Sequence, residues 1–143
     1  MKHGNQVYII GGGVYGCAVI PEVVKDFGIP KNHVYSGYFG DFSEKSMQKI
    51  FVNDFKYINC ATLDLSIPTT DDKSSVIKYL KDKKIIKNKI THIGDGTNDL
   101  EVQDAKVADK YIGFGVHRIV PKVKENAKIF VVNFEEFKKK LRK

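Results

Sequence analysis

The sequence contains few cysteines, no tryptophan and no long apolar run. Cys17 and Cys60 are too few for a disulfide framework in a chain of 143 residues, which favours reduced thiols and a cytoplasmic protein. No stretch approaches the roughly 20 apolar residues that cross a membrane. Residues 1–6 also lack the apolar region of a signal peptide. We therefore expect no membrane partner and no export.

Acidic residues are also scarce relative to basic ones, 17 against 24, which gives a net charge of +7. Much of the excess lies in two lysine clusters, Lys81–Lys89 and Lys138–Lys143. Neither cluster interleaves its charges with the aromatic side chains that stack on bases, so nucleic acid is not an expected partner. A positive field does suit an anionic phosphoester.

The hydrophobic fraction of 42% predicts a globular chain, and the length predicts one domain over residues 1–143. Short apolar runs predict strands at Val7–Ile10, His33–Phe39, Ile50–Ile58, Ile90–Ile93, Tyr111–Phe114 and Ile129–Val132. Cap residues and apolar spacing predict helices at Pro21–Phe27, Lys73–Lys84, Asn98–Ala105, Arg118–Asn126 and Phe134–Leu141.

Alternating strands and helices predict an α/β fold, with a mostly parallel sheet covered by helices on both faces. In such sheets, functional groups gather where the carboxyl ends of strands meet loops. Residues 42–72 carry a weak pattern, and their role stays open.

The strongest chemical pattern is Gly94-Asp95-Gly96-Thr97-Asn98-Asp99, which directly follows a predicted strand. A tight glycine turn can aim the carboxylates of Asp95 and Asp99 at one point. Carboxylate oxygens suit magnesium, which takes one or two of them together with substrate phosphate and water. The alternative is a plain strand-to-helix turn in which Asp99 only caps the helix.

Two other features occur in the order that a phosphate site requires. Gly11, Gly12 and Gly13 follow the first strand, and their backbone amides could hold phosphate oxygens. Lys73 opens a predicted helix before the Gly94–Asp99 turn, where its ammonium could neutralise a phosphoryl group. A simple tight turn and a surface lysine are the alternatives for these two features.

These motifs and the stretches around them, residues 6–37, 73–101 and 108–137, resemble the C-terminal half of eukaryotic-type phosphoserine phosphatases. That family belongs to the haloacid dehalogenase-like hydrolase superfamily. The resemblance implies a partial Rossmannoid domain without a cap domain. It also implies magnesium-dependent hydrolysis of a phosphomonoester, with L-phosphoserine as the substrate.

The resemblance also implies roles for individual residues. Asp95 is similar to the magnesium-binding aspartate of the family, and Asp99 to the second acidic residue, which holds metal-bound water or the neighbouring lysine. Lys73 is similar to the lysine that pairs with the nucleophile and the phosphoryl group. Gly12 is similar to the family glycine whose amide contacts phosphate, and Asn98 is similar to a polar residue near the phosphate or the substrate.

The sequence departs from this family at the nucleophile. No Asp-x-Asp-x-Thr or Asp-x-Asp-x-Val occurs in the 143 residues, and Gly11 replaces the usual serine or threonine. Covalent catalysis needs the attacking aspartate, so we expect little or no turnover and weak magnesium binding at best. The residues expected to act in catalysis are Lys73 and Asp99.

The family strand that carries the nucleophile lies between those predicted here at Val7–Ile10 and Ile90–Ile93. Three ways of replacing that strand stay open. The two flanking strands could pair directly, Ile50–Ile58 could fill the gap, or a second copy or a missing N-terminal segment could supply a strand. The expected ligand is a phosphorylated small molecule or free phosphate.

Three other interpretations stay open. The chain could be a non-catalytic relic that binds phosphate or a partner, or a fragment of a working phosphatase. Gly11–Gly16 also satisfies G-x-G-x-x-G, the pattern of flavin- and nicotinamide-binding proteins. Against that pattern, Pro21 would sit inside the helix it requires, and no acidic residue ends the strand at His33–Phe39.

Overall fold

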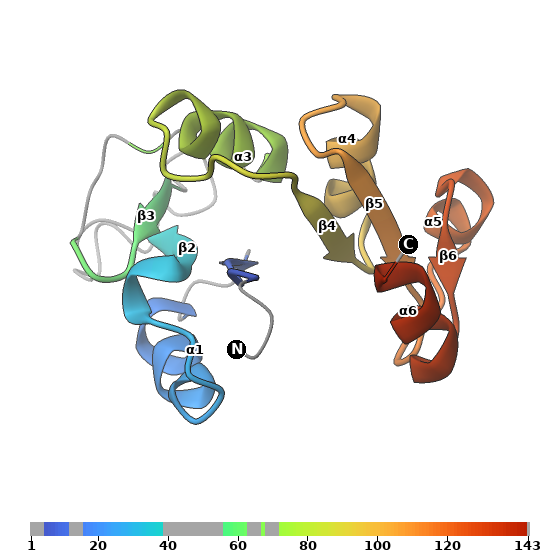
Figure 1. The fold of residues 1–143 in the computed structure, drawn as a ribbon, viewed down its shortest axis with the longest axis horizontal. Helices are drawn as coiled ribbons and strands as arrows, with labels where there is room; N and C mark the ends of the chain where they lie inside the picture. Colours follow the sequence, from blue (N-terminus) through green and yellow to red (C-terminus); the bar gives the residue numbers. More distant parts are fainter. Residues whose placement is uncertain (1–4, 12–15, 39–55, 63–66, 68–71, 143) are drawn as a thin grey trace, which may run out of the picture. The chain divides into compact units, whose positions relative to one another are not determined.

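The computed structural model describes residues 5–11, 16–38, 56–62, 67 and 72–142. The chain divides into two compact units, residues 1–71 and 72–143. Each unit contains a three-stranded sheet (Figure 1). Three of the four strand pairings are parallel, which confirms the predicted α/β class with mostly parallel strands.

The first sheet has the order β1-β2-β3. Strand β1 (Ile9–Gly11) pairs in parallel with β2 (Val34–Tyr38), and β3 (Lys56–Asn59) pairs with β2 in the antiparallel sense. A 3₁₀ turn at Lys31–His33 leads directly into β2. Helix α1 (Gly16–Lys25) packs against β2. The core of this unit contains Val24, Val34 and Cys60, with Ile9, Ile20 and Ile29 packed against them.

Helix α1 corrects the predicted start of the first helix. We expected a helix from Pro21, but α1 begins at Gly16 and contains Pro21 in its interior. Proline removes one helical hydrogen-bond donor, which usually places it in the first turn. Here Pro21 is buried, and burial of its apolar ring offsets that loss.

The expectation of reduced cysteines is wrong for Cys60, which is disulfide-bonded. Cysteines far apart in a sequence carry no signal of pairing, because only the fold decides whether their side chains meet. Cys60 follows β3 and is 5% exposed, so it also serves as a core residue.

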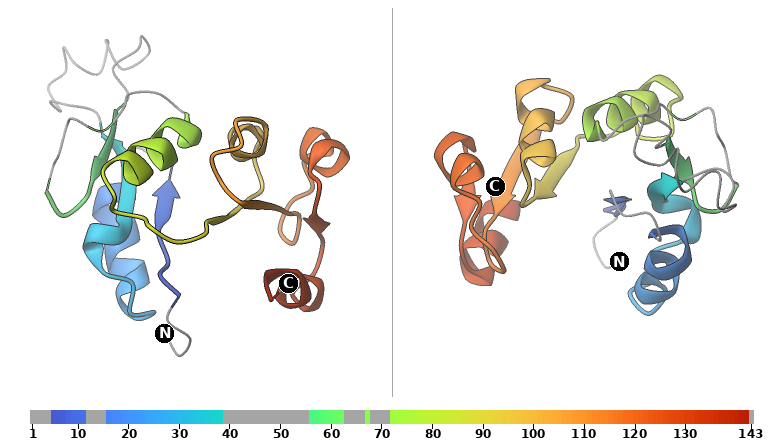
Figure 2. Two further views of the ribbon diagram at one scale, coloured as in Figure 1. Left: turned by 45° about the horizontal axis from the view of Figure 1, so that its top comes forward. Right: turned by 180° about the vertical axis from the view of Figure 1, so that it is seen from behind.

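The second unit begins with helix α3 (Lys73–Asp82) and contains the parallel sheet β4-β5-β6. The strands are β4 (Thr91–Gly94), β5 (Lys110–Phe114) and β6 (Phe130–Val131). Their connecting and closing helices are α4 (Thr97–Asp104), α5 (Pro121–Asn126) and α6 (Phe134–Leu141). Strand β5 pairs with β4 on one side and with β6 on the other, as the view from behind shows (Figure 2, right).

Local signals account for these elements. The Asp72 side chain accepts hydrogen bonds from the backbone N–H groups of Ser74 and Ser75, which fixes the start of α3 as predicted. Pro121 occupies the first turn of α5. Helix α4 packs against β4, β5 and α5. The core there contains Leu100, Tyr111 and Val123.

Strands β1 and β4 are edge strands of their sheets, and they correspond to the two strands that flank the nucleophile-bearing strand in the family. Within the described residues, β1 pairs only with β2, and β4 pairs only with β5. Strand β3 lies on the far side of β2, so the described part of Ile50–Ile58 does not fill a gap beside β1. Ile93 of β4 is 40% exposed, although strands of parallel sheets are usually buried.

No helix in the described part of the chain is both long enough and apolar enough to span a membrane.

Candidate functional site

The candidate site lies at the carboxyl end of β4 and centres on Asp99. Strand β4 ends at Gly94, the turn passes through Asp95 and Gly96, and α4 begins at Thr97. Asp99 is therefore in the first turn of α4, and it is only 3% exposed. A carboxylate with so little exposure requires charged or hydrogen-bonding partners.

Asp99 has those partners on three elements. Oδ1 of Asp99 accepts a hydrogen bond of 2.7 Å from Nζ of Lys73, which is the first residue of α3. The same Oδ1 lies 2.8 Å from Nε2 of His92 on β4. Its Oδ2 accepts from the backbone N–H of Gly96 at 3.1 Å. Asp99 thus caps α4 and also joins α3 to β4. Capping the helix is therefore only part of its structural role.

Gly94 allows this arrangement because it has no side chain. A Cβ at Gly94 would lie 2.0 Å from Cγ of Asp99, far closer than two carbon atoms can approach. Successive strand residues point to opposite faces, so positions 92 and 94 share a face. Asp99 therefore lies over Gly94 and reaches His92 on the same face of β4.

The partners of Asp99 also determine its ionisation. Burial alone would raise the pKa of Asp99, but the hydrogen bonds from His92 and Lys73 and the positive charge of Lys73 outweigh burial, and the pKa is lowered. Burial, followed by the charges of Asp99 and Asp95, raises the pKa of the Tyr111 phenol. The Tyr111 hydroxyl stays protonated and donates to the Gly94 carbonyl at 3.2 Å.

Sequence reasoning did not assign His92 and Tyr111 to this site. The signal for His92 was its place two residues before Gly94, on the strand that carries the turn. Tyr111 is the register partner of His92 on β5, and their rings stack with centroids 6.0 Å apart. No local pattern in the sequence marks a residue on the neighbouring strand.

The other predicted site residues have separate positions. Asp95 is exposed in the turn, and Asn98 is partly exposed in the first turn of α4. Gly11 ends β1, whereas Gly12 and Gly13 lie outside the described residues. The expected convergence of the glycine turn with Lys73 and Asp99 therefore stays a prediction.

The donor atoms at this site do not by themselves form a magnesium site. A carboxylate has about four lone-pair positions, and hydrogen bonds from Lys73, His92 and Gly96 use three of those on Asp99. Asp95 offers one exposed carboxylate. Within the described ranges, no group of three or more His, Cys, Asp or Glu side chains could hold a metal ion.

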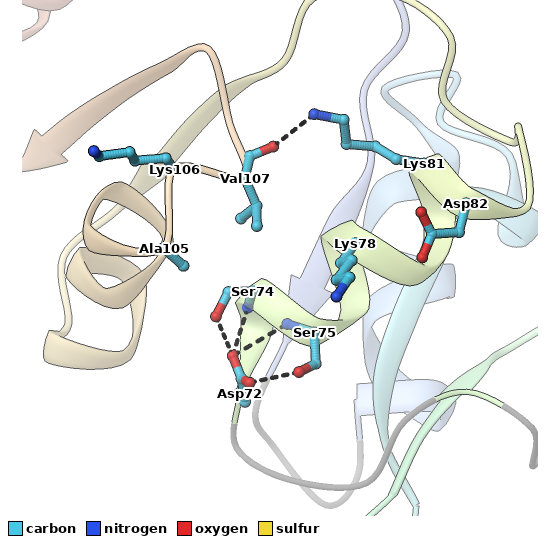
Figure 3. A pocket seen from close by; sticks show the side chains of 9 residues that line it. All are labelled: Asp72, Ser74, Ser75, Lys78, Lys81, Asp82, Ala105, Lys106 and Val107. Atoms are coloured by element: carbon cyan, nitrogen blue, oxygen red, sulfur yellow. Dashed lines mark hydrogen bonds between the residues drawn. The ribbon is translucent and has the colours of Figure 1, made fainter.

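A hollow of about 540 Å³ lies between α3 and the segment that follows α4 (Figure 3). Asp72 lines it but accepts from Ser74 and Ser75, while Lys81 donates to the Val107 carbonyl at 3.1 Å. These groups hold the helix start and the loop in place. The hollow contains neither Asp99 nor Asp95, so it is not the candidate site.

The structure removes one objection to the nucleotide-binding interpretation and leaves another. Helix α1 does begin at Gly16, the last glycine of the G-x-G-x-x-G pattern, despite Pro21. Strand β2, however, runs from Val34 to Tyr38 with no acidic residue to hold a ribose. The ion-paired cluster around Asp99 also has no place in that interpretation.

Comparisons with known proteins agree with the resemblance in the motifs. The chain is 34% identical to human phosphoserine phosphatase over 133 residues, covering 92% of this chain and 51% of the relative. It is 30% identical to the *Drosophila melanogaster* phosphoserine phosphatase over 140 residues, covering 93% of this chain and 44% of the relative. The chain thus spans about half the length of the curated relatives it matches. No family model matches the sequence.

Solved structures show the same fold. A phosphoserine phosphohydrolase-like protein from *Francisella tularensis* superposes with a TM-score of 0.72 at 23% identity, over 98% of this chain and 57% of that chain. DsGPDH of *Dunaliella salina* superposes with a TM-score of 0.65 at 24% identity, over 96% of this chain and 20% of that chain. The chain is therefore similar to phosphoserine phosphatases over nearly its whole length and corresponds to about half of the relatives it matches.

Proposed function

We propose that this chain carries one part of a phosphomonoester-hydrolysing site, with phosphoserine-type small molecules as the substrate class. The observation that supports this most is the Lys73–Asp99 pair beside the Gly94–Asp99 turn. It holds a primary ammonium at the carboxyl end of a parallel strand, where an anionic phosphoryl group would bind. Asn98 and the amides of Gly11–Gly13 are further phosphate-binding candidates.

The chain alone should bind phosphate without hydrolysing a phosphoester. Phosphoryl transfer in this family needs an aspartate that attacks phosphorus, and none of the aspartates in the sequence stands in an Asp-x-Asp-x-Thr or Asp-x-Asp-x-Val pattern. Lys73 can neutralise a bound phosphate, and Asp99 keeps that ammonium in position. Neither residue replaces the nucleophile.

Magnesium is the cofactor that the family implies, with Asp95 as its candidate ligand in this chain. Magnesium usually binds one or two carboxylates together with phosphate and several waters. Asp95 supplies one such carboxylate, while most of the acceptor positions on Asp99 are occupied. We therefore expect useful magnesium affinity only when a second carboxylate comes from outside the described residues.

The partner we propose is the polypeptide segment that corresponds to the half of the relatives that this chain does not span. Strand β4 pairs only with β5 among the described residues, and Ile93 at that edge is 40% exposed. A strand edge whose backbone groups lack a partner strand readily accepts another strand. A second copy of this chain is the alternative occupant.

Binding of inorganic phosphate tests the proposal directly. Chemical shifts of the ¹⁵N-labelled chain should change at Asn98 and Lys73 as phosphate is added, and Lys73→Met should abolish the change. Lys138→Met is the matched control, because Lys138 pairs with Glu135 on the exposed face of α6. Equal phosphate binding by the Lys73→Met variant and the parent chain would contradict the proposal.

A further inference from the structure

His92 contributes to the Asp99 cluster from the strand itself. Its Nε2 and the Nζ of Lys73 share Oδ1 of Asp99, at 2.8 Å and 2.7 Å. The side chains of His92, Lys73 and Asp99 are 11%, 17% and 5% exposed, so water has little access to these bonds. A shared acceptor couples the position of the ammonium to that of the imidazole.

The imidazole is itself held in place. Tyr111, its register partner on β5, stacks against it with an angle of 19° between the ring planes. The Tyr111 hydroxyl donates to the carbonyl of Gly94, the residue over which Asp99 lies. The neighbouring strand therefore fixes the plane from which His92 reaches Asp99.

We propose that His92 is a positioning residue that fixes the Asp99 carboxylate, so that Oδ1 of Asp99 is held against the Lys73 ammonium and is not available to a metal ion. Two nitrogen atoms share Oδ1, and Oδ2 accepts from Gly96, so ligation of a metal by Oδ1 would displace Lys73 or His92. A neutral imidazole protonated at Nε2 is sufficient, so the role requires no change in charge.

Strand geometry explains why position 92 fits this role. Side chains two residues apart on a strand share a face, so residue 92 projects from the same face of β4 as position 94. Gly94 has no Cβ, which leaves room for Asp99 on that face beside His92. A residue at 91 or 93 would point to the opposite face. This inference concerns the site of the proposed function, but it requires neither turnover nor phosphate.

Two substitutions separate positioning from packing. His92→Gln keeps a terminal N–H donor, whereas His92→Leu keeps an apolar side chain without a donor. NMR should show a Lys73 NH₃⁺ signal that exchanges slowly with water in the parent chain and in His92→Gln. In His92→Leu the signal should be lost or exchange several-fold faster. An unchanged signal in a folded His92→Leu variant would refute the positioning role.

A measurement on the parent chain keeps the proposal testable if His92→Leu does not fold. Long-range ¹H–¹⁵N spectra should show the His92 ring protonated at Nε2, and a ring protonated only at Nδ1 would refute the proposal. Addition of Mg²⁺ should leave the Asp99 ¹³Cγ and Lys73 NH₃⁺ signals in place. A shift of the Asp99 ¹³Cγ signal together with loss of the Lys73 NH₃⁺ signal would show that Asp99 binds Mg²⁺ in place of Lys73 and would refute the proposal.

Failure of the proposed function would be distinguishable from failure of this inference. If phosphate does not perturb Lys73 while the His92 and Lys73 signals behave as described, the phosphate site is refuted and the positioning role stands. If phosphate binds at Lys73 equally well in the parent chain and His92→Leu, with unchanged NH₃⁺ exchange, the positioning role is refuted alone.

Discussion

Asp99 is the residue on which the local structure of the site depends most. It is nearly buried and pairs with Lys73, so Asp99→Asn would leave a poorly exposed ammonium without its counter-charge. Breaking such a pair from one side destabilises proteins by about 3 kcal/mol or more. We expect urea unfolding monitored by circular dichroism to show a loss of this order.

The matched control for Asp99→Asn is Glu135→Gln on α6. Glu135 and Lys138 form a pair whose side chains are 75% and 61% exposed. Solvent screening limits such pairs to about 1 kcal/mol or less. Equal effects of the two substitutions would contradict the structural role given to Asp99.

Protonation of Asp99 predicts a specific loss of stability in acid. The pKa of Asp99 is lowered in the folded chain from an ordinary value of 3.8, because the hydrogen bonds from His92 and Lys73 and the positive charge of Lys73 outweigh burial. The carboxylate therefore stabilises the fold above the unfolded-state pKa, and this contribution is lost as the pH falls through the folded-state pKa. Unfolding free energies measured from pH 5 to pH 2 should fall less steeply in Asp99→Asn, with the difference appearing below about pH 4.

Gly94 and Gly96 offer a direct comparison at the turn. A Cβ at Gly94 would lie 2.0 Å from Asp99 Cγ, whereas a Cβ at Gly96 would lie 3.3 Å from Asp99 Oδ2. Gly94→Ala must displace Asp99 and should cost about 1–3 kcal/mol, with loss of the Lys73 pair. Gly96→Ala should cost less, and the reverse order in thermal unfolding would contradict the packing described.

At the scale of elements, the start of α3 decides where Lys73 lies. Asp72 accepts from the N–H groups of Ser74 and Ser75, and its pKa is lowered although burial opposes this. Asp72→Ala should therefore cost about 1 kcal/mol of stability and loosen the helix start that carries Lys73. Asn133→Ala, which removes the cap of α6, should cost a similar amount but leave the Lys73 NH₃⁺ signal unchanged.

The sequence was most informative where local signals determine the elements. The cap at Asp72 and the apolar spacing of Val76, Ile77 and Leu80 predicted α3 to within a few residues. Helix α5 begins at Pro121 and not at Arg118 as predicted, because proline favours the first turn of a helix. The start of α1 was missed because burial of Pro21 outweighs its preference for a first turn. The His92–Tyr111 contact was missed because pairing between strands leaves no local pattern.

At the scale of the whole molecule, the account predicts complementation. We expect a polypeptide covering the half of human phosphoserine phosphatase that this chain does not span to bind the chain and restore phosphate release from phosphoserine. Lys73→Met should abolish the restored activity, and Lys138→Met should not. A tight complex without activity would contradict the proposed site. Sedimentation showing a stable dimer of this chain that excludes the added segment would contradict the proposed partner.

The most direct test is phosphate release by the chain on its own. The purified chain is incubated with phosphoserine and Mg²⁺, and inorganic phosphate is measured over time beside the full-length human relative. We predict no release above the rate without protein, since the sequence contains no Asp-x-Asp-x-Thr or Asp-x-Asp-x-Val motif to supply the attacking aspartate. Clear magnesium-dependent release that disappears in Lys73→Met would contradict the central claim.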